Sequence, residues 1–215
     1  MTNNSPEYHL AELALARASR SPERLVPEIP PGAQRVLDIG CGAGQTLLAC
    51  RDQIPTAFGA DLDFDALLLG RRLQVPAALM QASGEQLPLR SASFDFVFSR
   101  VALPYMNISA ALIEVARVVR PGGGVWFTLH PLSMLSWKQA LSHPRRFVFE
   151  LYRLWNTAAL HFGHAQIRYP LRRSRTESYQ TVSGIEKVLT RTGFENIAIR
   201  KSGTHFVVQA QRGKH

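Results

Sequence analysis

A glycine-rich turn that follows an apolar run is the first part of the chain that could bind a nucleoside. The run contains one acid, Asp38, and the turn contains Gly40, Gly42 and Gly44. Glycines let the backbone turn tightly and let a ligand approach with no Cβ in the way. Glycine spacing alone is weak evidence, but the next apolar run ends in Asp61. That is about the spacing at which an acid reaches the ribose hydroxyls in nucleotide-binding α/β domains.

Asp38 indicates which kind of nucleoside the turn would bind. A dinucleotide would place its pyrophosphate at this turn, where a carboxylate repels it. S-adenosylmethionine has no phosphate and carries an ammonium and a sulfonium group, so Asp38 favours this cofactor over NAD. The chain also contains no Tyr-x-x-x-Lys sequence, which disfavours a nicotinamide-dependent reductase. The alternative role for Asp38 is a hydrogen bond to the backbone of its own loop, as in many turns.

The elements that must position these residues alternate along the chain. Short apolar runs typical of buried strands are separated by helical patterns, which indicates a parallel sheet with crossover helices. Pro121 and the glycines at 122–124 are expected to end one of these helices. The expected strands are 36–40, 56–63, 76–80, 94–99, 122–130, 193–201 and 205–211, and the expected helices are 46–54, 65–73, 108–120 and 185–192.

Two segments interrupt this alternation. Residues 1–31 are expected to form a leader helix and a proline-rich linker, and 32–215 a single domain. The leader helix is expected from Tyr8 to Arg20, with one face formed by Leu10, Leu13, Ala14 and Arg17. Within the domain, 131–180 is expected to be an inserted substrate cap. Its helical pattern places on one face Phe147, Leu151, Leu154, Trp155, Ala158 and Phe162.

Four motifs, in order, resemble the class I S-adenosylmethionine-dependent methyltransferases, and within them the type 11 group. Residues 36–44 are similar to the family's first motif, and Asp61 to its ribose-binding acid. Residues 84–89 followed by 93–97 resemble the region of the third and fourth motifs, and 117–123 is similar to the family's post-strand signature. The resemblance covers about 35–130, with a weaker similarity at 183–211. It implies a Rossmann-like, seven-stranded, mostly parallel sheet with helices on both faces.

The resemblance also implies a set of cofactor-binding residues. Leu62 would pack on the adenine, and Ser99 and Arg100 would lie near the transferred methyl group. Ser83 occupies the position at which the family usually has an aspartate that contacts the adenine amino group. The expected S-adenosylmethionine site comprises Asp38, Gly40, Cys41, Gly42, Gly44, Asp61, Leu62, Ser83, Gly84, Glu85, Ser99 and Arg100.

Several of these residues, and some of their neighbours, have a simpler structural interpretation. Leu62 could equally pack in the core. Asp63 is best explained as the N-cap of the helix that follows it. Asp95, at the start of an expected strand, is interpreted as structural. Cys41 and Cys50 have no CxxC spacing or accompanying histidines, so both are expected to be buried free thiols and no metal site is expected.

The reaction itself needs few catalytic groups. Methyl transfer from a sulfonium is an in-line displacement, and holding the acceptor close and collinear can supply about 7–11 kcal/mol. A base is needed chiefly for a hydroxyl or an acidic carbon. His130 is the first candidate, followed by His161, His164 and Tyr169. The alternative is that His130 is a structural residue, as single histidines beside apolar stretches usually are.

Charge indicates the class of acceptor. The formal net charge is +9, and 131–180 contains eight Lys or Arg against Glu150 and Glu177, which points to an anionic partner. The leading hypothesis is therefore a small anionic or aromatic metabolite, with Arg172-Arg173-Ser174-Arg175 either holding a carboxylate or phosphate or forming a solvated loop. The alternatives are an RNA acceptor bound by the same basic segment, and a non-catalytic protein that only binds the cofactor.

Location is a separate question. The basic and aromatic residues of 145–155 would also fit a helix at a membrane surface, although core packing explains the same stripe. The sequence contains no apolar run long enough for a membrane span, and 1–6 lacks the pattern of a signal peptide. We therefore expect a soluble, cytoplasmic protein.

Overall fold

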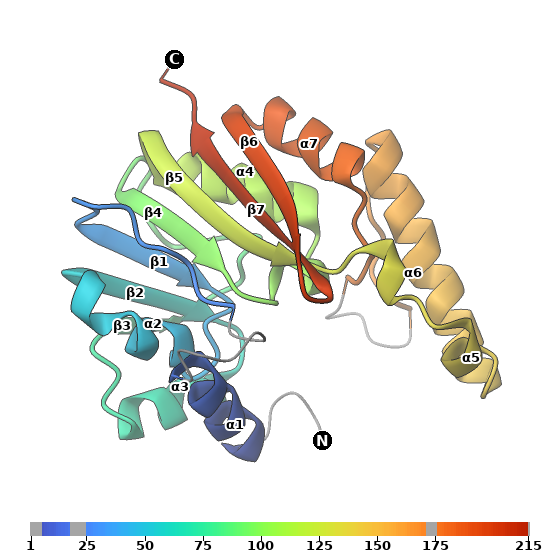
Figure 1. Cartoon of the computed structure of the whole chain (residues 1–215), viewed down its shortest axis with the longest axis horizontal. Coiled ribbons are helices and arrows are strands. Elements are labelled where there is room, and N and C mark those ends of the chain that lie inside the picture. Colours follow the sequence, from blue (N-terminus) through green and yellow to red (C-terminus); the bar gives the residue numbers. More distant parts are fainter. Residues whose placement is uncertain (1–5, 18–24, 171–175, 215) are drawn as a thin grey trace.

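A seven-stranded sheet forms the centre of the computed structural model, which describes residues 6–17, 25–170 and 176–214 (Figure 1). The strand order is β3-β2-β1-β4-β5-β7-β6, and β7 is antiparallel to both of its neighbours. The Rossmann-like, mostly parallel fold expected from the sequence is confirmed. The strands are β1 (Arg35–Ile39), β2 (Thr56–Asp61), β3 (Ala78–Gln81), β4 (Phe94–Ser99), β5 (Val119–Leu129), β6 (Phe194–Ser202) and β7 (His205–Arg212).

Helices cover both faces of this sheet, as expected. Leu112, Leu160 and Leu189 belong to one buried cluster, and Leu13 and Leu47 belong to the other. Among the described residues, no helix is both long enough and apolar enough to cross a membrane. The helices are α1 (Pro6–Arg17), α2 (Gln45–Ala49), α3 (Phe64–Arg72), α4 (Ile108–Val118), α5 (Trp137–Ala140), α6 (Pro144–Phe162) and α7 (Val182–Arg191), with short 3-10 turns at Arg51–Gln53, Leu103–Tyr105 and Leu132–Met134.

The register of the parallel strands brings the predicted turn and acid together. Ile39, at the end of β1, pairs with Ala60, next to the last residue of β2. Asp38 pairs with Gly59 on one side and with Phe98 of β4 on the other. Because parallel strands end at one edge of a sheet, the loops after β1, β2 and β4 are neighbours there. A ligand site at this edge therefore draws on residues more than sixty positions apart in sequence.

The helix expected at 108–120 is shorter than its apolar pattern. It ends at Val118, and Val119 already pairs with Phe94 in the sheet. The glycines at 122–124 do not end the helix, because they lie within β5. Proline disfavours the helical conformation of the residue before it, here Arg120, which accounts for an end upstream of Pro121.

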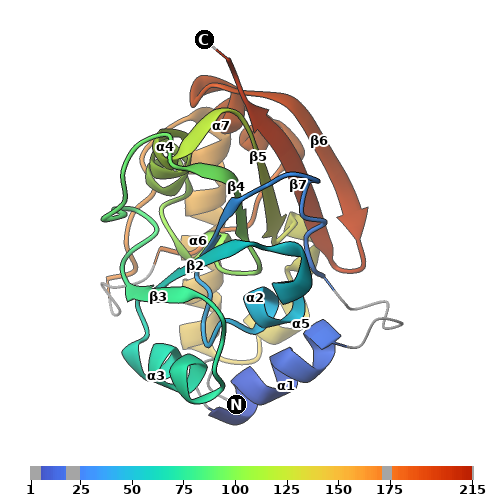
Figure 2. The ribbon, with the colours of Figure 1, turned by 90° about the vertical axis from the view of Figure 1, so that its left-hand side faces the viewer.

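The leader helix is present, but its buried face differs from the expected one. Helix α1 buries His9, Leu13 and Ala16, whereas Leu10 is 48% exposed. Residues 18–20 of the expected helix lie outside the described residues. Helix α1 packs against α2 and α3 (Figure 2). The leader segment therefore lies directly beside the predicted cofactor turn.

The helix expected within 145–162 is confirmed as α6, but it does not bury its apolar stripe. Leu151, Trp155 and Phe162 are 47%, 63% and 68% exposed. The buried side instead includes Asn156 and Thr157, which hydrogen-bond to neighbouring segments. Core packing therefore does not explain this stripe.

Candidate active site

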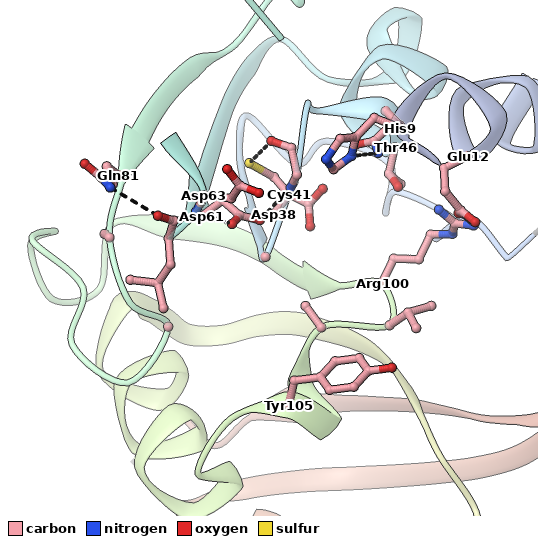
Figure 3. A pocket seen from close by; sticks show the side chains of 18 of the residues that line it. His9, Glu12, Asp38, Cys41, Thr46, Asp61, Asp63, Gln81, Arg100 and Tyr105 are labelled. Atoms are coloured by element: carbon pink, nitrogen blue, oxygen red, sulfur yellow. Dashed lines mark hydrogen bonds and ion pairs between the residues drawn. The ribbon is translucent and has the colours of Figure 1, made fainter. Parts of the chain in front are cut away.

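A cavity of about 1090 Å³ opens at the carboxyl edge of the parallel strands. The turn after β1 and the ends of β2, β3 and β4 form most of its wall, and α1 forms one side. Acidic side chains gather on the side of β1 and β2, while Arg100 and Tyr105 lie across from them (Figure 3). This division suits a ligand with a cationic part and a second compound beside it.

The glycines of the turn are required by backbone conformation and by close packing. Gly40, Gly42 and Gly44 have positive φ angles of 72°, 55° and 77°. A Cβ on Gly40 would overlap the side chain of Ala102, and one on Gly44 would lie 2.8 Å from Val75 Cγ1. The turn therefore admits no side chains at these positions and exposes backbone to the cavity.

Asp38 is a buried acid without a full set of partners. It is 2% exposed, and its Oδ1 has no hydrogen-bond partner among the described residues. Burial and the nearby Asp61 raise its pKa well above the usual value, although Arg100 opposes this shift. A cation in the cavity would satisfy this carboxylate, so the site fits the ammonium or sulfonium group of S-adenosylmethionine and does not fit a phosphate.

Asp61 shapes the loops around it. One of its carboxylate oxygens accepts a hydrogen bond from Gly42 N at 2.7 Å, and the other accepts one from Asp63 N at 2.8 Å. The role considered as the alternative for Asp38, binding loop backbone, is thus performed by Asp61. Leu62 is 61% exposed on the cavity wall, so core packing does not explain it. Asp63 is the N-cap of α3, as expected, and accepts hydrogen bonds from the backbone of the first turn.

Eight of the twelve predicted cofactor residues line the cavity, and four do not. Ser99 is fully buried and donates to Ile39 O at 2.7 Å. Ser83 Oγ accepts from Glu85 N, and Glu85 Oε1 accepts from Asn107 N. Cofactor contact by all twelve residues stays a prediction. The eight in the wall are Asp38, Gly40, Cys41, Gly42, Asp61, Leu62, Gly84 and Arg100.

Arg100 is the cation on the opposite side of the cavity. It follows β4, and its Nη2 pairs with Glu12 of α1 at 2.5 Å. The Arg100 side chain is 11% exposed, and its Nε has no hydrogen-bond partner among the described residues. Tyr8, His9 and Glu12 of α1 line the cavity with Tyr105, although the sequence indicated no more than a leader helix there. Nothing in the spacing of these residues distinguishes them from an ordinary helix surface.

None of the four candidate bases lines the cavity. His130 is 5% exposed and packs edge-on against the Tyr105 ring, with centroids 5.3 Å apart. Burial, His205 and Arg153 lower its pKa to about 4. His161 is bound to Thr181 Oγ1, and the remaining two candidates, His164 and Tyr169, lie beyond α6. His130 therefore lies behind a wall residue, with Tyr105 between it and the cavity.

The remaining sequence predictions concern Asp95, the two cysteines, a metal site and the basic run at 172–175. Asp95 is structural, as expected, because its Oδ2 accepts from Gln34 N and Arg35 N and its Oδ1 pairs with Arg120. Cys41 and Cys50 are buried free thiols, and burial raises the pKa of Cys41. Within the described ranges no group of three His, Cys, Asp or Glu could hold a metal ion. The basic run at 172–175 lies outside the described residues.

Comparison with known proteins agrees with this geometry. The family model for a methyltransferase domain, of the type 11 group, matches residues 37–127, which contain most of the cavity wall. S-adenosylmethionine is the cofactor of this family. The chain thus has the fold typical of class I S-adenosylmethionine-dependent methyltransferases, and its residues 37–127 match the methyltransferase domain of the type 11 group.

Two relatives with the same name show how much of the chain is similar to a known enzyme. The malonyl-[acyl-carrier protein] O-methyltransferase of Enterobacter lignolyticus is 37% identical over 111 residues, which are 51% of this chain and 44% of that protein. The enzyme of the same name from Alcanivorax borkumensis is 25% identical over 202 residues, 89% of this chain and 68% of that protein. The chain thus spans less than half the length of the first of these relatives.

Solved structures show the same fold. Phosphoethanolamine N-methyltransferase 2 of Haemonchus contortus, in complex with S-adenosyl-L-methionine, superposes with a TM-score of 0.65 at 16% identity, over 99% of this chain and 58% of that chain. A methyltransferase of Methanosarcina mazei superposes with a TM-score of 0.61 at 19% identity, over 89% of this chain and the whole of that one.

Proposed function

We propose that this protein methylates a carboxylate oxygen of a small anionic acceptor. The observation that carries the proposal is Arg100, a nearly buried cation across the cavity from Asp38 that is held by a single carboxylate, Glu12. Arginine presents a fork of donors suited to carboxylates. The acceptor carboxylate would pair with Arg100 in place of, or beside, Glu12. The relatives named malonyl-[acyl-carrier protein] O-methyltransferase support the proposal, because a malonyl group has a free carboxylate.

A carboxylate acceptor also accounts for the position of His130, His161, His164 and Tyr169 outside the cavity wall. A carboxylate is already ionised near neutral pH, so its oxygen can attack without losing a proton. When bound, S-adenosylmethionine would supply a methyl group activated by its sulfonium, which leaves as a neutral thioether. Asp38 would hold the cationic part of the cofactor, Arg100 would orient the acceptor, and α1 would limit the access of water. Catalysis then rests chiefly on position.

The proposal is tested with the full chain, methyl-labelled S-adenosylmethionine and a panel of carboxylate, amine and phenol acceptors that includes malonyl thioesters. A methyl ester releases labelled methanol in mild base, whereas N-methyl and aryl ether products keep the label. We expect base-labile label from carboxylates alone. Stable label, or transfer to RNA, would refute the proposed acceptor, and binding of cofactor without transfer to any acceptor would favour a non-catalytic protein.

Variants assign the acceptor role to Arg100. Arg100→Met should lower kcat/KM for the carboxylate about 10- to 100-fold, the usual value of a hydrogen bond to a charged group. Because this change leaves Glu12 unpaired, the double variant Glu12→Gln/Arg100→Met should show the same loss in a fold of normal stability. Arg90→Met, which alters an exposed arginine outside the cavity, is the matched control. Equal activity of the double variant and the control would contradict the role.

A further inference from the structure

The exposed apolar side chains of the described residues are concentrated in one segment. Nine of the fourteen large ones lie between 132 and 167, and the other five are scattered from Leu10 to Val182. In α6 they follow the helical period, with Val148, Leu151, Trp155 and Phe162 on one face. Trp137 and Leu141, at α5, are exposed as well, and α5 contacts α6. We call these six residues the α5–α6 apolar surface.

The opposite side of α6 is fixed by polar contacts, which determine where this surface points. Asn156 Nδ2 donates to Ile167 O at 2.9 Å, and Asn156 Oδ1 accepts from Ile167 N at 2.9 Å. Thr157 Oγ1 accepts from Tyr179 N, and the Arg153 guanidinium lies 3.9 Å from the centre of the Tyr179 ring. Turning the helix to bury its apolar face would break these bonds. The outward direction of the apolar surface is therefore built into the fold.

Charge distinguishes between the occupants of such a surface. Residues 131–170 contain one acid, Glu150, which is bound to Arg153 and Tyr179, and the exposed bases Lys138, Arg145 and Arg146 lie in the same segment. A second copy would bring like charges together, which disfavours self-association. A protein partner needs polar groups at its interface, about one hydrogen bond per 100–200 Å². Among the four exposed apolar side chains of α6, only Trp155 offers such a group, its indole N–H.

We propose that the α5–α6 apolar surface binds an anionic lipid surface, with α6 lying in the plane of the membrane interface. Its nineteen residues make a helix of about 28 Å. An apolar face, tryptophan and nearby basic residues are what an interfacial helix requires. Both helices lie at the far end of the molecule from β3 (Figure 1). Docking there would leave the cofactor side of the cavity uncovered.

The chain contains its own probes for this proposal. Two of its three tryptophans, Trp137 and Trp155, belong to the apolar surface and are 51% and 63% exposed, while Trp126 is 2% exposed in the core. Vesicles of phosphatidylglycerol and phosphatidylcholine should shift the tryptophan emission to the blue and sediment the protein. Vesicles of phosphatidylcholine alone should bind the protein at least about tenfold more weakly. Raised salt should release the protein.

Matched variants distinguish binding by this surface from nonspecific hydrophobic binding to vesicles. Leu151→Ser/Phe162→Ser keeps both probes and should weaken vesicle binding more than tenfold. Leu10→Ser/Ile113→Ser removes two side chains of similar exposure, 48% and 59%, from α1 and α4, and should bind as the unaltered protein does. Arg145→Glu/Arg146→Glu should abolish the preference for anionic vesicles.

Three outcomes would overturn the proposal. The first is equal loss of binding in both serine variants. The second is an absence of vesicle binding by a protein that light scattering shows to be a dimer, with the Leu151→Ser/Phe162→Ser variant monomeric. That result would assign the surface to a second copy. The third is a monomer that binds neither type of vesicle.

Discussion

At the scale of single residues, Asp38 should lower the stability of the ligand-free protein and raise its affinity for the cofactor. Its burial and the nearby Asp61 raise its pKa, so keeping it ionised near neutral pH costs stability in the ligand-free protein. A cation beside it would lower that pKa again. Asp38→Asn should therefore weaken binding of S-adenosylmethionine about 10- to 100-fold, as expected for a hydrogen bond to a charged group. The same variant should raise the Tm of the free protein by about 2–4 °C for each kcal/mol gained.

The pH dependence of binding has a definite sign. Because the cation favours the ionised carboxylate, affinity should fall as pH falls through the raised pKa of Asp38 in the free protein. Calorimetry at several pH values measures this, with proton release accompanying binding where Asp38 is protonated beforehand. Asp38→Asn should remove the slope. A slope that persists in the variant would assign the titration to another group.

His130 should affect acid stability more than catalysis. Its pKa is lowered to about 4, against about 6.5 in an unfolded chain. As pH falls from about 6.5 to 4, the unfolded state binds the proton first, so stability is lost across this window. At about 1.4 kcal/mol per pKa unit, the loss reaches about 3 kcal/mol for this buried side chain. His130→Gln should flatten the dependence.

Urea unfolding at pH 7 and at pH 4 tests this expectation. His205, whose pKa is lowered by its own burial and by Arg100, remains in both proteins, so the difference between them reports His130. With a carboxylate acceptor, kcat of His130→Gln at pH 7 should stay within about threefold of the original, since no proton is removed. A loss of a hundredfold or more, and an unchanged acid profile, would each contradict this assignment.

At the scale of elements, α6 buries two polar side chains and leaves several large apolar ones exposed. Asn156 is fully buried with three hydrogen bonds to backbone, whereas Trp155 beside it is 63% exposed. Asn156→Ala should lower the free energy of unfolding by about 2–4 kcal/mol because buried carbonyl and amide groups lose their partners. Trp155→Ala should change it by no more than about 0.5 kcal/mol. Denaturant unfolding of the two variants is the measurement, and a larger loss for Trp155→Ala would show that its ring is buried in solution.

The same helix shows where sequence-based prediction of this fold ends. Periodicity located α6 to within a residue, and the four methyltransferase motifs placed β1, β2 and β4. Periodicity marks an apolar face but says nothing of what covers it, so the sequence left both core packing and a membrane surface open for α6, and only its exposure in the structure excludes core packing. The cofactor turn was predictable because glycine and acid act within one loop. Glu12 meets Arg100 only through folding, 88 residues apart, so sequence spacing carried no signal for it.

At the scale of the whole molecule, the cofactor side of the cavity and the lipid-facing surface lie on different parts of one sheet. Loops after β1 and β2, with α1, form the cofactor side, and the segment between β5 and α7 contains α5 and α6. Leu160 of α6 belongs to the same buried cluster as Ile39 of β1, so the two regions share a core. No described residue of α5 or α6 lines the cavity. The cofactor and the lipid vesicles should therefore each slow amide hydrogen exchange only in the region that binds them.

Amide hydrogen exchange can separate the two regions in one protein. S-adenosylhomocysteine, at about 100 times its Kd, adds about 2.7 kcal/mol to global stability, and local protection should exceed this general effect at 38–46, at 61–65 and in α1. Anionic vesicles should slow exchange in 137–162 and leave 38–46 unchanged. Protection of α1 is the sharpest test, because Glu12 and His9 reach the cavity from that helix alone. If α1 exchanged equally fast with and without cofactor, it would not be part of the bound site, and Arg100 would lose its proposed partner. If vesicles and cofactor protected the same amides, the separation of the two surfaces would be wrong.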